Sequence, residues 1–447
     1  MNLYRLLQQR QADGNPIRVG LIGAGKFGAM YLAQAVATPG IHILGIADLS
    51  LNRAQHSLQL VGWPKEQYAA KSFDDALNSG TTYLLEDAVE LISTPKIDVV
   101  IDATGSPSAG VKHVVAACES GCDIIMVNVE TDALVGPLLS QKAAAAGIVY
   151  SLAYGDQPAL ICEMVDWARA AGLEVVSAGK GTKYLPSYHA STPDTVWDYY
   201  GLSEEQAKAG GMNAQMFNSF LDGTKSGIEM AAVANATGLA VPEHGLAFPP
   251  CTKNELHDLL IPKDFGGTLE RSGMVEVISS QARSGDALSD DLRWGVYAVF
   301  EASNDYATRC FSEYGLSTDK SGRYASMYKP YHLIGLELGI SVASVALRKE
   351  PTGFPVLWQA DVVATAKRAL KAGEVLDGEG GYTVWGKLMS AKKSVQSNAL
   401  PLGVANHCRL RRDIPEGGTV TYADVELDES QQLIKFRREL ERTFEAH

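Results

Sequence analysis

The chain has 447 residues, 46% of them hydrophobic and 20% charged, and a formal net charge of −13 at pH 7. This composition is typical of a globular protein and excludes a disordered one. The length predicts two or three domains, each large enough for its own core. General binders of nucleic acid or of anionic membranes are usually basic. The acidic balance therefore argues against both, and an anionic ligand would need a local basic pocket.

The cysteines and the N-terminus indicate a cytoplasmic protein. Of the six cysteines, only Cys118 and Cys122 lie close together, and the three residues between them fit neither a zinc ribbon nor a CxxC redox motif. Free thiols in a reducing compartment are therefore expected. The N-terminal residues lack the apolar core of a signal peptide. The apolar stretch from Leu333 to Leu347 contains Glu337 and is too short to span a bilayer.

The first third of the chain alternates apolar strands with helices. After a polar, helix-prone start at residues 1–15, helices are predicted after residue 28, at about 51–60 and at about 108–120. The strands between them are short, apolar and β-branched. They are predicted at 17–22, 41–47, 97–103, 122–127 and 148–152. This alternation predicts an α/β fold with a doubly wound parallel sheet.

A glycine motif follows the first of these strands. Gly23, Gly25 and Gly28 form a GxGxxG turn that opens a helix, and Asp48 ends the second strand 20 positions after Gly28. Strand, turn, helix and acidic residue in this order are typical of a Rossmann dinucleotide site. Gly23 permits the tight turn, Gly25 lets the pyrophosphate approach the backbone, and Gly28 lets helix and strand pack closely. The helix N-terminus attracts the phosphates. We therefore assign residues 1–155 to an NAD(P)-binding domain.

Further candidate cofactor contacts lie around this motif. Lys26 and Phe27 lie within the turn. Asp48 would hydrogen-bond the ribose of NAD, whereas Ser50 and Arg53 could accept the 2′-phosphate of NADP, so the residues alone leave the choice open. Candidate contacts to the ribose and nicotinamide follow the strand at 97–103 and are Thr104, Gly105 and Ser106. The alternative for these three residues is a plain strand-to-helix turn.

Candidate chemical groups follow the strand at 122–127. Asn128 and Glu130 come at its carboxyl end, where ligands bind in such folds. Helix capping by Asn128 is an equally good interpretation.

A basic cluster lies in the segment from Ser177 to His189. Lys180 and Lys183 are read as part of a glycine-rich turn after an apolar strand, and such a turn can hold a phosphate, with His189 nearby. The alternative is a solvated loop.

A third cluster is read as one helix face. Asp222, Lys225 and Glu229 have the spacing i, i+3 and i+7, which places them on one side of a continuous helix. Such a row can relay protons or ligate a metal. The alternative is a ladder of surface salt bridges, which the apolar neighbours disfavour.

The remainder of the chain predicts two further domains. Residues 156–350 are read as an α+β catalytic domain whose last helix, at 331–347, packs back on the first domain. Residues 351–447 are read as a small β-rich domain. Within it, residues 367–376 resemble residues 411–420, which predicts two equivalent turns before a final helix at 431–444.

Four long runs carry a family resemblance. They are GLIGAGKFG, GDQPALICEMVDWARAAGLEVVSAGKGTKYLP, STPDTVWDYYGL and NSFLDGTKSGIEMAAVANATGL. They resemble the DXR-like (DRL) family, the second class of 1-deoxy-D-xylulose 5-phosphate reductoisomerases. That family is related to homoserine dehydrogenases, and its C-terminal part resembles a SAF module.

The resemblance implies NADPH, a divalent cation (Mg²⁺ or Mn²⁺), a small phosphorylated sugar as substrate, and the first committed step of the methylerythritol phosphate route to isoprenoids. We also expect a homodimer or a larger homo-oligomer.

The implied reaction is a skeletal rearrangement followed by hydride transfer. From chemistry alone we assign phosphate binding to Lys180, Lys183 and His189, and proton transfer to Asp222 and Lys225. Glu130 and Glu229 are the candidate metal ligands, because an enolate intermediate would need a cation.

Two other functions compete with this assignment. A homoserine dehydrogenase carries an Asn-Lys pair where this chain has Asn128-Val-Glu130, and its Asp-to-Lys spacing also differs. The other alternative is a protein that binds nicotinamide as a sensor without catalysis.

Overall fold

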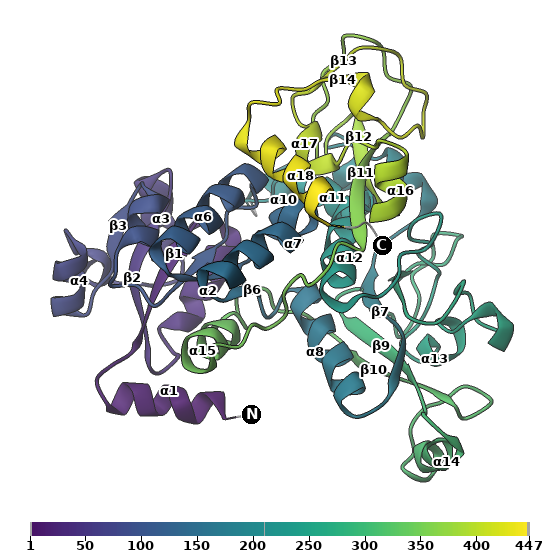
Figure 1. Cartoon of the computed structure of the whole chain (residues 1–447), viewed down its shortest axis with the longest axis horizontal. Coiled ribbons are helices and arrows are strands. Elements are labelled where there is room, and N and C mark those ends of the chain that lie inside the picture. Colours follow the sequence, from purple (N-terminus) through teal and green to yellow (C-terminus); the bar gives the residue numbers. More distant parts are fainter. Residues whose placement is uncertain (1, 210, 445–447) are drawn as a thin grey trace. The chain divides into compact units, whose positions relative to one another are not determined.

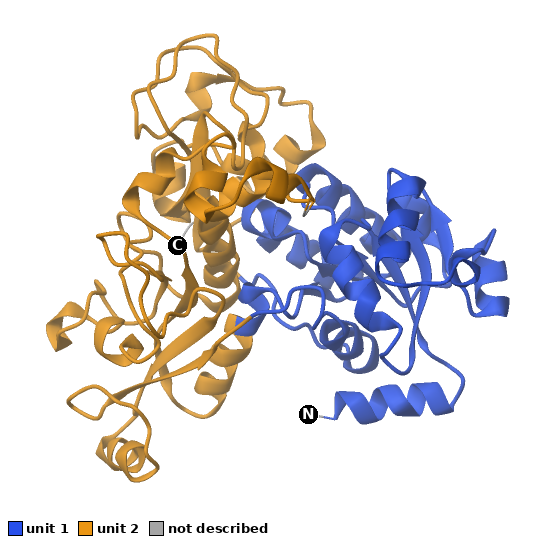
Figure 2. Cartoon of the chain, turned by 180° about the vertical axis from the view of Figure 1, so that it is seen from behind, with its two compact units in different colours: residues 1–160, 332–356 blue, residues 161–331, 357–447 orange. Residues whose placement is uncertain are grey.

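The structure is a computed structural model that describes residues 2–209 and 211–444. The chain forms two compact units (Figure 2). The first comprises residues 1–160 and 332–356, and the second comprises residues 161–331 and 357–447. These units do not follow the three predicted domains, because residues 332–356 return to the first unit and residues 357–447 group with the central segment.

The first unit contains the predicted parallel sheet. Its six strands have the order β3-β2-β1-β4-β5-β6, and every neighbouring pair is parallel. Figure 1 labels β1, β2, β3 and β6 of this sheet. The strands are β1 (Ile17–Ile22), β2 (Ile41–Ala47), β3 (Tyr83–Leu85), β4 (Val99–Asp102), β5 (Asp123–Met126) and β6 (Tyr150–Leu152). Five of the six were predicted. The sequence interpretation missed β3, which is only three residues long and too short for a periodic signal.

Helices of the first unit connect the strands and supply part of its core. They are α1 (Leu3–Ala12), α2 (Lys26–Ala35), α3 (Leu51–Leu60), α4 (Phe73–Ser79), α5 (Ala88–Ser93), α6 (Pro107–Ser120), α7 (Val129–Ala146) and α15 (Gly339–Arg348), with the 3-10 turn Lys65–Tyr68. Helix α15 buries Val342 and Val345 in the same apolar core as Val19 and Ile125 of the sheet. The last predicted helix of the central segment therefore packs on the parallel sheet of the first unit.

That helix is shorter than predicted. The expected range was 331–347, but α15 begins only at Gly339. Gly335 has φ +79° and lies against α2, where an added Cβ would come within 2.7 Å of the Met30 Cβ. The chain therefore approaches α2 in a glycine turn rather than in a helix.

The second unit is built around a mixed sheet of order β10-β9-β7-β8. Strand β8 is parallel to β7, while β9 is antiparallel to both β7 and β10. The strands are β7 (Glu174–Thr182), β8 (Met274–Ser279), β9 (Val296–Glu301) and β10 (Tyr324–Lys329). The helices before and around this sheet are α8 (Gln157–Ala170), α9 (Val196–Tyr200), α10 (Glu204–Ala209), α11 (Ala214–Leu221), α12 (Thr224–Thr237), α13 (Leu256–Leu259) and α14 (Asp305–Glu313), with 3-10 turns at Pro186–Ala190 and Lys263–Phe265.

The C-terminal part of this unit contains two small antiparallel sheets. Strands β11 (Ala360–Ala366) and β12 (Val384–Ser390) pair along their whole length, as do the short strands β13 (Arg409–Leu410) and β14 (Val425–Glu426). The helices are α16 (Ala391–Gln396), α17 (Leu402–Ala405) and α18 (Gln432–Thr443), with a 3-10 turn at Tyr422–Asp424. Among the described residues, none of the helices has the length and apolar character needed to traverse a bilayer.

The predicted internal repeat is visible in the backbone. Leu370 and Ile414 hold equivalent positions in the two copies, and each donates its N–H to the carbonyl oxygen of the other, at 2.8 and 2.9 Å. Gly373 and Gly417, also equivalent, both adopt positive φ angles in the turns that follow. The two copies therefore pair with each other.

Candidate functional site

The glycine turn has a shape that leaves room for a ligand. Gly23 has φ +91°, and an added Cβ there would come within 2.9 Å of the Ala103 carbonyl oxygen. A Cβ at Gly28 would collide with the carbonyl oxygen of Gly23. At Gly25 no atom lies within 4 Å of the Cβ position, so the space above this residue is open. Gly25 is also the N-cap of α2 and offers no capping side chain, so an anion could approach the first N–H groups of the helix.

The carboxylate of Asp48 accepts hydrogen bonds from groups of the protein at all of its acceptor positions. Its Oδ2 accepts from the Ala24 N–H at 2.9 Å and from the Arg53 Nε at 3.2 Å. Its Oδ1 accepts from the Ser50 N–H at 2.9 Å and from the Arg53 Nη2 at 2.6 Å. A carboxylate has about four acceptor positions, and all of them are used here. The Asp48 side chain is 0% exposed, whereas that of Arg53 is 56% exposed.

The ends of strands β4 and β5 bring the next predicted residues together. Asn128 is fully buried and caps α7, while its Nδ2 donates to the Ser106 carbonyl oxygen at 2.9 Å and to the Thr104 Oγ1 at 3.2 Å. Ser106 in turn caps α6. Asn128 therefore has the capping role that was the alternative to ligand contact, and Ser106 belongs to a strand-to-helix turn, as its own alternative had it. The Glu130 carboxylate lies beside Gly105, 3.9 Å from its Cβ position.

Lys180 lies in a strand, which makes the predicted glycine-rich turn wrong. The segment Gly179-Lys180-Gly181 is part of β7, and its glycines are required because a Cβ at either position would collide with a neighbouring carbonyl oxygen. The Lys180 ammonium forms a buried ion pair with Glu229 of α12, and both side chains are less than 10% exposed. Lys180 therefore neutralises a buried carboxylate.

The predicted row of Asp222, Lys225 and Glu229 is broken. Helix α11 ends at Leu221, and Gly223, with φ +91°, separates it from α12. Asp222 therefore does not share a helix face with the other two. Lys225 and Glu229 remain four positions apart on α12, which places them on one side of that helix.

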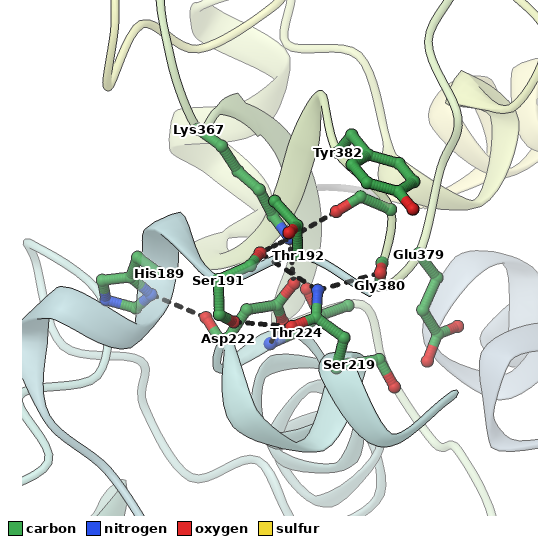
Figure 3. A network of polar contacts seen from close by, with 12 residues as sticks. His189, Ser191, Thr192, Ser219, Asp222, Thr224, Lys367, Glu379, Gly380 and Tyr382 are labelled. Carbon is green, nitrogen blue, oxygen red and sulfur yellow. Dashed lines mark hydrogen bonds and ion pairs between the residues drawn. The ribbon is translucent and has the colours of Figure 1, made fainter. Parts of the chain in front are cut away.

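Asp222 instead belongs to a buried polar network (Figure 3). Its carboxylate forms an ion pair of 2.8 Å with Lys367, and its Oδ1 accepts from the Thr224 N–H at 2.9 Å. Burial raises the pKa of the Asp222 carboxyl, and the Lys367 ammonium opposes this shift. Lys367 also donates to the carbonyl oxygens of Ser191 and Gly381. No local sequence signal points from Asp222 to Lys367, which lies in the C-terminal repeat.

His189 is neutral and does not provide a positive charge for a phosphate. Its Nδ1 lies 2.7 Å from the Asp222 carbonyl oxygen, which can only accept, so Nδ1 carries the proton. Its Nε2 accepts from the Tyr184 hydroxyl at 2.9 Å. Burial lowers the pKa of His189 to about 4. His189 therefore offers a phosphate no positive charge, and its predicted place beside the substrate phosphate stays a prediction.

Lys183 has a neighbouring cation that the sequence interpretation missed. Its ammonium donates to the Tyr199 carbonyl oxygen and lies 5.6 Å from the centroid of the Tyr200 ring. Arg293 lies 5.7 Å from the same ring and 4.6 Å from that of Trp294. Burial and the Arg293 charge both lower the pKa of Lys183. The structure therefore brings two cations together beside aromatic rings.

The metal ligands predicted from sequence do not form a site within either unit. Glu229 is paired with Lys180, and Glu130 belongs to the first unit. Among residues 2–209 and 211–444, no three His, Cys, Asp or Glu side chains are grouped so that they could hold a metal ion. The divalent cation that the resemblance implies, with Glu130 and Glu229 as its ligands, therefore stays a prediction.

Two family models match parts of the chain. Residues 155–338 match the catalytic domain of oxidoreductase DRL, and residues 17–127 match the NAD-binding Rossmann fold of an oxidoreductase family that its model names GFO_IDH_MocA. The chain matches no curated protein sequence. The first match agrees with the DRL resemblance, and the links to homoserine dehydrogenases and to a SAF module stay predictions.

Solved structures share only part of this chain. A myo-inositol dehydrogenase from Lactobacillus casei is 15% identical, with TM-score 0.29, over 40% of this chain and 50% of that one. An oxidoreductase from Agrobacterium radiobacter is 16% identical, with TM-score 0.27, over 37% and 44%. A DOX-P reductoisomerase in complex with magnesium is 15% identical, with TM-score 0.33, over 50% and 58%. The chain spans about half the length of each of these structures.

The sheet, the glycine turn and the two family matches lead to one conclusion. The chain is an NAD(P)-dependent oxidoreductase with a Rossmann fold in its N-terminal part.

Proposed function

We propose that the protein is an NADPH-dependent reductoisomerase that converts 1-deoxy-D-xylulose 5-phosphate to 2-C-methyl-D-erythritol 4-phosphate. The observation that carries this proposal is the pair of adjacent cations, Lys183 and Arg293, within the segment that matches the DRL catalytic domain. In a chain of net charge −13, such a pair supports an anionic substrate.

NADPH is the cofactor that the second strand of the Rossmann sheet favours. Asp48 has no acceptor position left for a ribose hydroxyl, because Ala24, Ser50 and Arg53 use all four. More than half of the Arg53 side chain is exposed, so its guanidinium could meet a 2′-phosphate as well as Asp48. The pyrophosphate would lie over Gly25 at the N-terminus of α2.

The substrate phosphate would bind Lys183 and Arg293. The two side chains repel each other, and a phosphate between them would remove that repulsion. The Tyr200 ring lies beside both cations, and partial burial of the two side chains would strengthen their attraction for a phosphate. Lys180, Lys225 and Glu229 would handle protons, because Lys180 and Glu229 are in contact and Lys225 lies on the same side of α12. Asp222 would hold the backbone in place through Lys367.

The reaction needs a rearrangement and a reduction. One carbon–carbon bond of the ketose phosphate breaks and another forms, which gives a branched aldehyde, and NADPH then delivers a hydride to its carbonyl carbon. A proton must leave one hydroxyl during the rearrangement, and another must reach the new alkoxide. We assign no ligands to a divalent cation and derive no step through one.

The test is the oxidation of NADPH by purified protein on addition of 1-deoxy-D-xylulose 5-phosphate with Mg²⁺ or Mn²⁺. We expect substrate-dependent loss of absorbance and a branched polyol phosphate as product. No loss of absorbance with either cation would contradict the proposal. Oxidation of homoserine with NAD(P)⁺ in a parallel assay would favour the dehydrogenase instead. Tight cofactor binding with no turnover would favour a sensor.

A further inference from the structure

A cavity of about 250 Å³ lies within the second unit. Its walls include His189 and Gly223 from the centre of the chain, His244 and Phe248 from the loop before β8, and Trp385 and Lys387 from β12. One water takes about 30 Å³ of liquid volume, so the cavity can hold a small ligand. None of the predicted site residues except His189 lines this cavity.

Strand β12 places two side chains on the same wall of the cavity. Trp385 and Lys387 are two positions apart in a strand, so both lie on one face of the hairpin. The Trp385 ring stacks on His189 with centroids 3.8 Å apart. Because Asp222 and Tyr184 hold His189 by both ring nitrogens, this wall has a fixed position.

Lys387 extends along a glycine that leaves room for it. Gly245 has φ +86°, and a Cβ at that position would lie 3.2 Å from the Lys387 Cε. A larger residue there would displace the lysine side chain. The glycine turn therefore lets Lys387 extend along the cavity wall.

Lys387 gives this cavity a positive charge, and no carboxylate among the described lining residues balances it. Three titratable groups line the cavity, His189, His244 and Lys387. Lys387 is half-buried and has no hydrogen bond or ion pair in the part of the chain that the structure describes. Burial and the nearby Lys393 both lower the pKa of Lys387. A half-buried ammonium without an acceptor is unfavourable, and an anion would relieve this cost.

We propose that this cavity is an oxyanion site in which Lys387 of the C-terminal hairpin binds a phosphate or carboxylate group. The exposed His244 supplies a second donor at the rim, and the stacked Trp385 and His189 form an apolar wall for the rest of a small ligand. The site is separate from the Lys183 and Arg293 pair, and it does not depend on the proposed reaction. It gives the C-terminal part of the chain a role in ligand binding.

Inorganic phosphate is the probe for this site. The ring signals of His189 in NMR spectra report binding locally, and calorimetry measures the affinity. We expect phosphate to shift the His189 signals and to raise its pKa, because an anion stabilises the charged imidazole. A parallel titration with malonate separates phosphate from carboxylate recognition. Stronger binding of either anion supports the site and identifies its preferred group.

Four variants make the test specific. Lys387→Gln should weaken anion binding at least tenfold, roughly 1.4 kcal/mol, while Lys387→Arg should retain it. Lys392→Gln removes the same charge from an exposed position on α16 and should bind as the unmodified protein does. Lys183→Ala should leave the His189 response unchanged, which separates this site from the proposed substrate phosphate.

Two results would overturn the proposal. One is the absence of a His189 response to either anion in the unmodified protein. The other is an equal response in Lys387→Gln when thermal unfolding shows that this variant is folded. The test measures anion binding and not reductoisomerase activity. A protein that lacks this activity could therefore still bind the anion in this cavity, so the two proposals can fail independently.

Discussion

Lys367 and Asp222 form an ion pair of 2.8 Å in which neither side chain is more than 2% exposed. Lys367 also donates to the carbonyl oxygens of Ser191 and Gly381, each at 2.7 Å. The ammonium group therefore has three buried oxygen partners. This arrangement connects the C-terminal repeat to the turn between α11 and α12, so Asp222 is better explained as a structural residue than as a proton carrier.

Loss of the Lys367 charge should destabilise the second unit. Lys367→Met leaves the Asp222 carboxylate buried without a counter-charge, which costs about 3–5 kcal/mol. The double variant with Asp222→Asn should recover part of this loss. Urea denaturation measures both effects. Lys371→Met is the control, because its ion pair with Asp413 is exposed and should contribute less than about 1 kcal/mol.

The three glycines of the nucleotide turn should respond differently to alanine. Gly25→Ala places a methyl group in open space, so the folding free energy should change by less than about 0.5 kcal/mol, while NADPH binding weakens at least tenfold. Gly28→Ala collides with the Gly23 carbonyl oxygen and should cost about 1–3 kcal/mol of stability. Thermal unfolding and cofactor fluorescence separate the two effects. Normal NADPH binding by Gly25→Ala would contradict this geometry.

Arg53 should decide between the two nicotinamide cofactors. Arg53→Gln removes a guanidinium that could bind the 2′-phosphate and also uncovers Asp48. A hydrogen bond to a charged group contributes about 1.5–3 kcal/mol, so the Kd for NADPH should rise roughly tenfold or more, while that for NADH stays constant or falls. Lys65→Gln, at an exposed position in the same unit, should change neither. Equal weakening of both cofactors would argue against a 2′-phosphate contact.

Loss of Lys183 or Arg293 should weaken the binding of the substrate more than that of the cofactor. Lys183→Ala and Arg293→Ala are each expected to raise KM for 1-deoxy-D-xylulose 5-phosphate at least tenfold, with a much smaller change in KM for NADPH. Steady-state kinetics with each substrate varied in turn gives both values. The exposed Lys320→Ala is the control. Similar changes in both KM values would place the phosphate elsewhere.

Glu276 should make stability depend on pH near neutrality. Its carboxylate accepts from the N–H groups of Ala247, Phe248 and Val277, yet burial still raises its pKa from 4.5 to about 7. Between these values the folded state binds more protons than the unfolded state, so this contribution to stability is complete below pH 4.5 and is lost as the pH rises through 7. The slope is about 1.4 kcal/mol per pH unit.

The comparison with Glu276→Gln isolates this effect, since a neutral amide resembles the protonated acid. Its stability should fall less than that of the unmodified protein between pH 4.5 and 7, as measured by urea denaturation at each pH. Parallel profiles for the two proteins would show that Glu276 is not responsible.

The parallel sheet could be predicted closely because its strands are buried on both faces and read as continuous apolar runs. The predicted bounds of β1 and β2, 17–22 and 41–47, agree with the structure. The paired repeats, Leu370 with Ile414, were also visible because both copies keep the same glycine turn.

The chemical groups were harder to predict because their partners are distant in sequence. Glycines around Lys180 indicated a turn, but β7 needs them because Gly179 lies against the backbone of β8 and Gly181 against the Leu292 carbonyl oxygen before β9. Helical spacing placed Asp222 beside Lys225, but the single residue Gly223 ends that helix. Arg293 and Lys387 belong to no motif, and the repeat that contains Lys367 does not indicate Asp222 as its partner, so only the tertiary fold reveals the surroundings of these three residues.

Helix α15 completes the core of the first unit, although residues 161–331 separate it from the rest of that unit. A ribosome must therefore release most of the catalytic segment before the nucleotide-binding core can close. A nascent chain that has reached only residue 160 carries the apolar surface that Val342 and Val345 later cover, and such surfaces are prone to aggregation. We therefore expect the first unit to keep this apolar surface exposed during synthesis until helix α15 has been made.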